Sequence, residues 1–293
     1  MSFASLKRSR GNFDKLTKEL EKVAVPTTNQ NSSGDDRFWK PELDKTGNGY
    51  AVIRFLPAVE GEELPWARVW SHAFQGPGGW YIENSLTTLG QKDPVSEENT
   101  KLWNTGSDAD KEIARKRKRK LSYYSNVLVI SDPKHPENEG KVFLFKFGKK
   151  IFDKITEAMQ PAFEDEKPVN PFDFWKGANF KLKIRKVDGY WNYDKSEFEA
   201  VSPVAEDDEK IKSIWKQQHA LKPFLDPSNF KTYDELKEKL NRTITGVRST
   251  TTADKVDLPP QNNSSVKSNE VASTSASDDD DTLSYFSKLA EEE

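Results

Sequence analysis

The stretch that most constrains the fold is Lys111–Ile130, KEIARKRKRKLSYYSNVLVI, in which a dense basic run leads directly into an apolar run. Seven of its first ten residues are Lys or Arg, and two tyrosines, Tyr123 and Tyr124, follow them. The β-branched segment Val127–Ile130 predicts a buried strand. Cations follow a phosphate backbone and aromatic rings stack on bases, which is how many proteins hold single-stranded nucleic acid. A solvated charged loop leading into a core strand fits the same pattern.

The composition describes a polar chain with two oppositely charged parts. Of its 293 residues, 34% are hydrophobic and 32% are charged, which predicts that part of the chain is disordered. Residues 249–293 hold ten acidic and three basic residues, a net charge of −7, and subtracting this from the total of −3 leaves +4 on residues 1–248. A mildly basic body with an acidic tail is compatible with a nucleic-acid partner.

Several protein classes are excluded by what the sequence lacks. There is no cysteine, which excludes disulfides and thiolate metal sites. No apolar run approaches a membrane span and no secretory signal is recognisable, so we expect a cytosolic protein. Phosphate-binding, dinucleotide-binding, HExxH and Gly-x-Ser-x-Gly motifs are absent, and His72, His135 and His219 lie far apart in the chain. We therefore expect a binding protein and not an enzyme.

Composition divides the chain into four parts. Residues 1–25 form a basic arm with a short amphipathic helical pattern, and residues 26–36, PTTNQNSSGDD, have the composition of a linker. Residues 37–248 are predicted to be the folded core. Residues 249–293 are of low complexity and predicted to be disordered, and they end in DDDDTLSYFSKLAEEE, which has the form of an acidic motif that folds on a partner.

The core is predicted to consist of short strands with a few peripheral helices. This arrangement favours a mainly β (α+β) fold, and specifically an OB-fold Greek-key barrel, whose strand face and loops bind oligonucleotides. Other small barrels and sandwiches fit the strand pattern as well. Residues 84–110 are polar and predicted to be a loop. The predicted strands are 50–56, 66–74, 80–82, 127–130, 141–147 and 178–187, and the predicted helices are 148–159, 207–219 and 232–241.

Cations stand next to aromatic residues in three places, which favours one shared nucleic-acid groove over three unrelated surface features. Arg54 also interrupts an apolar strand, where a cation is either paired or facing a ligand. The three places are Arg115, Lys116, Arg117, Lys118, Arg119 and Lys120 before Tyr123 and Tyr124, Lys146 between Phe145 and Phe147, and Lys181–Lys186 before Tyr190, Trp191 and Tyr193.

Five longer segments resemble one known family, the single-stranded DNA-binding proteins of T-even-like bacteriophages (gene 32 proteins). The likeness covers most of residues 37–245, and the order of basic arm, body and acidic tail is similar too. The segments are GNGYAVIRFLP (47–57), GWYIENS (79–85), KRKLSYYSNVLVISDP (118–133), PENEGKVFLFKFGKKIFDKI (136–155) and GANFKLKIRKVDGYWNYDKSEF (177–198).

The resemblance implies an OB-fold core that binds single-stranded DNA cooperatively and without sequence preference. It implies that Lys7, Arg8, Ser9 and Arg10 mediate self-association along DNA, with a similar motif at Lys118–Ser122. The acidic tail would cover the cationic groove when DNA is absent. By the same resemblance, the residues that match DNA-cleft positions are Arg54, Trp103, Lys118, Arg119, Lys120, Tyr123, Phe145, Tyr190 and Tyr193.

The sequence departs from the family at its structural zinc site, which one histidine and three cysteines form in the best-known member. His72 matches that histidine by context, but Asn84–Asn99 contains no cysteine. Carboxylates such as Asp93 or Glu97 make a poor structural zinc site. We therefore expect no zinc and no other cofactor, with His72 a packed core residue.

The resemblance also implies a biological setting in the cytoplasm of an infected host cell. The protein would coat and protect single strands during phage DNA replication, recombination and repair. Its tail would recruit the polymerase, the helicase loader, the recombinase and the recombinase mediator. Two alternatives stay open on the sequence alone: an acidic-tailed recruitment scaffold with weak nucleic-acid binding, and an RNA-binding module.

Overall fold

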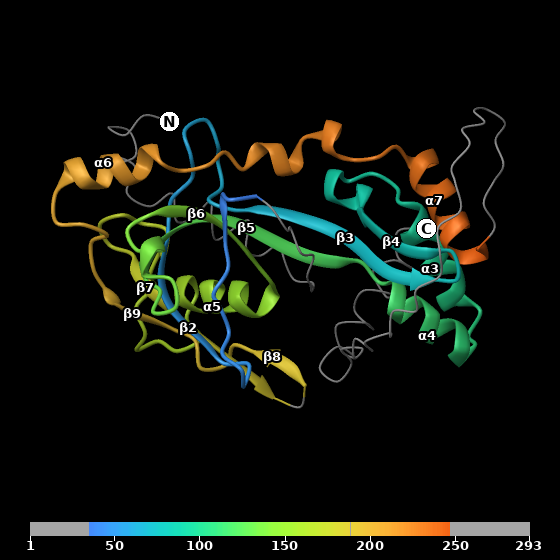
Figure 1. The fold of residues 1–293 in the computed structure, drawn as a ribbon, viewed down its shortest axis with the longest axis horizontal. Helices are drawn as coiled ribbons and strands as arrows, with labels where there is room; N and C mark the ends of the chain where they lie inside the picture. Colours follow the sequence, from blue (N-terminus) through green and yellow to red (C-terminus); the bar gives the residue numbers. More distant parts are fainter. Residues whose placement is uncertain (1–34, 188, 247–293) are drawn as a thin grey trace, which may run out of the picture.

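The protein is built on one branched sheet of nine strands, seen in a computed structural model that describes residues 35–187 and 189–246 (Figure 1). Neighbouring strands follow the order β1-β6-β5-β2-β7-β8, with β3 and β4 attached through β5 and β9 attached to β7. The strands are β1 (Phe38–Trp39), β2 (Gly49–Phe55), β3 (Ala67–Gly76), β4 (Gly79–Asn84), β5 (Lys120–Ser131), β6 (Val142–Phe147), β7 (Ala178–Val187), β8 (Tyr190–Asn192) and β9 (Glu197–Val201).

Helices lie on both sides of the long β3–β5 pair. In Figure 1, the segment that carries α6 and α7 runs along one side of this pair, and α5 and α4 lie on the other. The α-helices are α3 (Pro94–Asn104), α4 (Asp108–Arg117), α5 (Lys149–Met159), α6 (Asp208–Lys216) and α7 (Tyr233–Thr245), and the 3-10 turns are η1 (Leu86–Leu89), η2 (Pro136–Asn138), η3 (Lys222–Leu225) and η4 (Pro227–Asn229).

Strand β5 organises the fold because it pairs with three others along its length. Its first part pairs with β3, its middle with β6 and its end with β2, all antiparallel. Alternate side chains of a strand point to opposite faces. Leu121, Tyr123, Val127 and Val129 accordingly face the main core, which β2, β6, β7 and α5 complete. Most predicted strands, and the helix at α5 with its buried apolar face, are confirmed.

A second lobe forms where the β3–β4 hairpin extends beyond the main core. Its small core consists of Phe74, Tyr81, Leu86, Val95, Leu236 and Leu240, from β3, β4, η1, α3 and α7. The predicted loop at 84–110 is wrong, because η1, α3 and the start of α4 occupy it. Asp93 caps α3 and Pro94 occupies its first turn. Only Val95 is a large buried aliphatic residue in α3, so the helix carries a weak amphipathic signal.

The fold class is mixed, with strands and helices both well represented. The OB-fold stays a prediction, since strand pairing within 35–187 and 189–246 follows an open, branched path. The predicted arm and tail lie outside the described residues, as does most of the linker. Within the described ranges, no helix has both the length and the apolar character that a membrane crossing requires.

Candidate nucleic-acid interface

The basic run is an ordered junction between the second lobe and the central strand. Arg115, Lys116 and Arg117 form the last turn of α4, where positive charge is favourable beside the helix carbonyls. The chain leaves the helix at Lys118, and Lys120 begins β5. The run therefore has a defined position, in contrast to the solvated loop that was the alternative reading.

Two arginines of this junction lie over aromatic rings of β3. The Arg119 guanidinium is 4.2 Å from the centroid of the Trp70 ring, and the Arg117 guanidinium is 5.5 Å from that of Phe74. Both rings lie on one face of β3, because they are four residues apart on a strand. Sequence reasoning recognised this strand but missed the contribution of its rings. The period-two spacing of Trp70, His72 and Phe74 is the signal that identifies them.

Trp103 joins the same surface from α3. Its ring lies 5.9 Å from Lys111 Nζ and 5.6 Å from the Arg115 guanidinium, and it packs against buried Ala114. The structure therefore brings Trp103 together with Arg115 of the basic run, and the residue lies on a helix where a loop was predicted. Cations resting on aromatic faces gain an electrostatic attraction of about 0.5–2 kcal/mol each.

Tyr123 and Phe145 lie in the main core and not at the predicted DNA surface. Tyr123 is completely buried, and its ring stacks on Phe152 with centroids 3.9 Å apart. Burial raises the pKa of the Tyr123 hydroxyl. Phe145 packs against Trp39 at 5.4 Å. The physical reason for this correction is the pleat, which turns Tyr123 inward and its neighbour Tyr124 outward.

Arg54 is likewise an internal residue, so of the two readings of this cation the paired one holds. Its guanidinium donates to the carbonyls of Asp173 at 2.9 Å and Ser202 at 2.7 Å, and to the side chain of Asn179 at 3.3 Å. Burial lowers the pKa of Arg54 to about 10, although the Asp173 carboxylate opposes this shift. The side chain ties β2 to two distant segments of the core.

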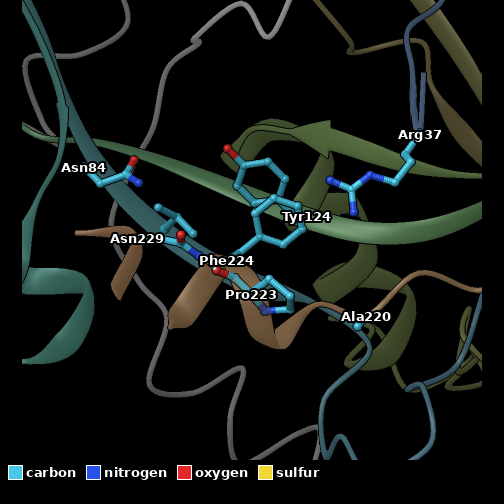
Figure 2. Close-up of a pocket in the computed structure, with 8 residues that line it drawn as sticks. Arg37, Asn84, Tyr124, Ala220, Pro223, Phe224 and Asn229 are labelled. Atoms are coloured by element: carbon cyan, nitrogen blue, oxygen red, sulfur yellow. Dashed lines mark hydrogen bonds between the residues drawn. The ribbon is translucent and has the colours of Figure 1, made fainter. Parts of the chain in front are cut away.

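Tyr124 lies on the opposite face of β5 from Tyr123 and lines a cavity of about 260 Å³ (Figure 2), and Lys146 is its paired residue on β6. The Tyr124 ring stacks on Phe224 at 4.4 Å, and Lys146 Nζ is 5.6 Å from its centroid. Burial and repulsion by Lys40 lower the pKa of Lys146 to about 8. The cavity is lined by Arg37, Val69, Asn84, Tyr124, Ala220, Pro223, Phe224 and Asn229.

On β7, three of the cations that were predicted to join a nucleic-acid groove are paired with acidic neighbours. The three ion pairs are Lys181–Glu199 at 3.0 Å, Lys183–Glu197 at 2.7 Å and Arg185–Asp194 at 2.5 Å. The predicted contacts Tyr190 and Tyr193 are both partly buried, and Tyr193 packs against the main core. Trp191 between them is 37% exposed, and Lys186 Nζ lies 5.9 Å from its ring.

His72 is completely buried, which confirms the prediction that it is a packed residue. Its Nε2 lies 3.2 Å from Asp93 Oδ1, and its Nδ1 lies 2.9 Å from the Arg117 carbonyl. Among residues 35–187 and 189–246, no group of three or more His, Cys, Asp or Glu could hold a metal ion. Structural zinc takes four ligands, usually cysteine and histidine. The residues around His72 do not fit this requirement.

Comparison with known proteins shows the family to which the chain belongs. A family model described as "gp32 DNA binding protein like" matches residues 47–244. The single-stranded DNA-binding protein of Enterobacteria phage T2 is 42% identical over 220 residues, which cover 73% of this chain and 72% of that protein. The single-stranded DNA-binding protein of Enterobacteria phage T4 is 40% identical over 237 residues, which cover 77% of each. The chain therefore belongs to the gp32-like family of DNA-binding proteins.

Proposed function

We propose that this protein binds single-stranded DNA without reading its sequence. The observation that carries the proposal is the ordered basic junction, in which Arg117 and Arg119 lie over Phe74 and Trp70. Guanidinium groups suit phosphate oxygens, and the contacts need no particular base. Trp103 and exposed Trp191 offer further rings for stacking, worth about 1–3 kcal/mol per base. The names of the T2 and T4 relatives support the same ligand.

The proposal extends to cooperative binding and to a role in phage DNA replication, recombination and repair. The arm, with Lys7, Arg8, Ser9 and Arg10, would contact the neighbouring copy along the strand. The acidic tail, residues 249–293, would compete with DNA for the basic junction and recruit replication and recombination proteins. An OB-fold core would supply the binding surface. These finer features rest on the family resemblance and on the charge distribution of the sequence.

A titration of the full chain with poly(dT), followed by intrinsic fluorescence at several salt concentrations, tests the proposal. We expect quenching, because bases stack near tryptophan. We also expect log Kobs to fall linearly with log salt, by about 0.7 for each phosphate contact. Poly(rU) of the same length is the comparison that tests the RNA reading. Absence of salt-sensitive binding to poly(dT) would contradict the proposal.

Two truncations separate the proposed function from the recruitment scaffold. Deletion of residues 1–22 should abolish cooperativity while leaving binding to a short oligonucleotide intact. Deletion of residues 249–293 should tighten DNA binding, because a competing polyanion has been removed. The scaffold alternative predicts instead that DNA affinity stays negligible without the tail.

A further inference from the structure

A buried polar cluster joins four segments of the second lobe. His72 comes from β3, Ser85 from the N-cap of η1 directly after β4, Asp93 from the N-cap of α3, and the Arg117 carbonyl from the end of α4. The three side chains are 0–1% exposed. Segments that are separate in sequence therefore meet at one desolvated point, where each polar group depends on its protein partners.

The Asp93 carboxylate is the centre of this cluster. Its Oδ1 accepts from the backbone N–H groups of Val95 and Ser96, each at 3.0 Å. Its Oδ2 accepts from the Ser85 hydroxyl at 2.9 Å and from the Leu86 N–H at 3.2 Å. Burial alone would raise the pKa of Asp93, but His72, the Ser96 N–H and the Ser85 hydroxyl outweigh burial and hold this pKa at about 2.

This arrangement leaves no role for a structural metal ion. The oxygens beside His72 are one carboxylate oxygen of Asp93, at Nε2, and the backbone carbonyl of Arg117, at Nδ1. Each oxygen of that carboxylate already accepts two backbone or hydroxyl hydrogen bonds. Zinc would have to displace those bonds and would still lack thiolate or further imidazole ligands. The protein groups instead supply the connections directly, through the His72–Asp93 contact and several hydrogen bonds.

His72 also connects the cluster to the basic junction. Its Nδ1 lies 2.9 Å from the Arg117 carbonyl, at the residue where α4 ends and just before the chain turns toward β5. The side chain of the same Arg117 lies over Phe74, two residues from His72 on the same face of β3. A hydrogen bond at this carbonyl therefore fixes the position of the end of α4 against β3. It also fixes the position of the cations in the last turn of α4.

We propose that the His72–Asp93–Ser85 cluster holds the second lobe together without a metal ion, and that His72 is a positioning residue for the basic junction. The metal-free half stands on the geometry of the cluster alone. The positioning half rests on the proposed function, because it concerns how Arg117 and its neighbours meet DNA.

The metal-free half is tested on the purified full chain. We expect elemental analysis to find far less than one zinc per chain, and the melting temperature to be the same with EDTA, without EDTA and with added zinc. One zinc per chain together with a lower melting temperature in EDTA would overturn this half. Asp93→Asn keeps an oxygen for the N–H groups of α3 but loses the charge opposite His72, and we expect it to lower the melting temperature by about 3–10 °C. An unchanged melting temperature in this variant would also overturn it.

The positioning half is tested by two substitutions, each of which keeps one of the two polar contacts of His72 and removes the other. In His72→Asn the side-chain amide replaces Nδ1 and keeps the bond to the Arg117 carbonyl, whereas in His72→Gln it replaces Nε2 and keeps the contact with Asp93. We expect both variants to melt at lower temperature. The salt slope is the fall in log Kobs per unit of log salt concentration. Only His72→Gln should bind poly(dT) with a smaller salt slope than the parent, and the decrease should be about 0.7–1.4, which corresponds to one or two phosphate contacts. Leu236→Val, in the same small core, is the control that loses stability without losing slope.

Equal salt slopes for His72→Asn and His72→Gln would overturn the positioning half, because a purely structural histidine predicts this result. Absence of poly(dT) binding by the parent protein would overturn the proposed function and the positioning half together. The zinc and melting measurements would still decide the metal-free half, so the two failures are distinguishable.

Discussion

The guanidinium of Arg119 lies 4.2 Å from the centroid of the Trp70 ring, and that ring is only 7% exposed. Trp70 is therefore a support for a cation rather than a surface on which a base stacks. The sequence suggested two independent kinds of contact, phosphates to cations and bases to rings. In the structure, the buried Trp70 ring instead supports the Arg119 guanidinium from within the protein.

Arg119→Ala should weaken binding of poly(dT) by about 1–3 kcal/mol, because a charge-assisted contact to phosphate is lost. The salt slope should fall by about 0.7 for the missing contact. Fluorescence titrations over a range of salt concentrations measure both quantities. Lys216→Ala, on an exposed turn of α6, removes an equal charge far from the junction and should change neither. Equal effects of the two substitutions would show that only net charge matters.

Tyr123→Phe should leave stability unchanged or raise it by about 1 kcal/mol. The Tyr123 hydroxyl is buried without a hydrogen-bond partner, so its removal relieves a desolvation cost. Tyr123→Ala should cost about 3–5 kcal/mol, because the ring fills the core against Phe152. Urea unfolding measures both changes. Weaker DNA binding by a fully folded Tyr123→Leu variant would show that this ring reaches the DNA.

Arg54→Met should lower the free energy of unfolding by about 3–5 kcal/mol, because it leaves two buried carbonyls and an amide oxygen without their donor. Urea unfolding gives this value, and the salt slope of DNA binding by the folded variant should equal that of the parent. A normal stability with a reduced salt slope would place Arg54 against DNA instead.

Lys146→Met should be more stable than the parent at pH 7, and this advantage should shrink as the pH rises from 8 toward 10. The pKa of Lys146 is about 8 in the folded state, below its ordinary value of 10.5. Between these values the unfolded chain holds more protons, so the parent gains stability with rising pH. Unfolding at several pH values, with exposed Lys150→Met as the control, measures the difference. A constant difference across this range would contradict the lowered pKa.

The sequence predicted the elements whose signal is local. An apolar run identified β2, and a glycine-rich turn between two strand candidates identified the β3–β4 hairpin. Alternation identified β6 and β7, and a helical apolar stripe identified α5. The basic run and the family motifs pointed to a nucleic-acid partner. Helices α3 and α4 were missed, because their residues are mostly polar and their positions depend on packing against β3 and α7.

By itself, then, the sequence determined the order of the strands along the chain, the charge of the basic junction and the family. Only the tertiary structure decided which aromatic residues face a ligand. Tyr123 and Tyr124 are adjacent and chemically alike, yet the pleat turns one into the core and the other toward Phe224. Arg54 finds its partners 119–148 residues away, and Asp93 meets His72 across two segments. Local periodicity in the sequence predicts the strands, whereas contacts between residues far apart in the chain decide which side chains are buried.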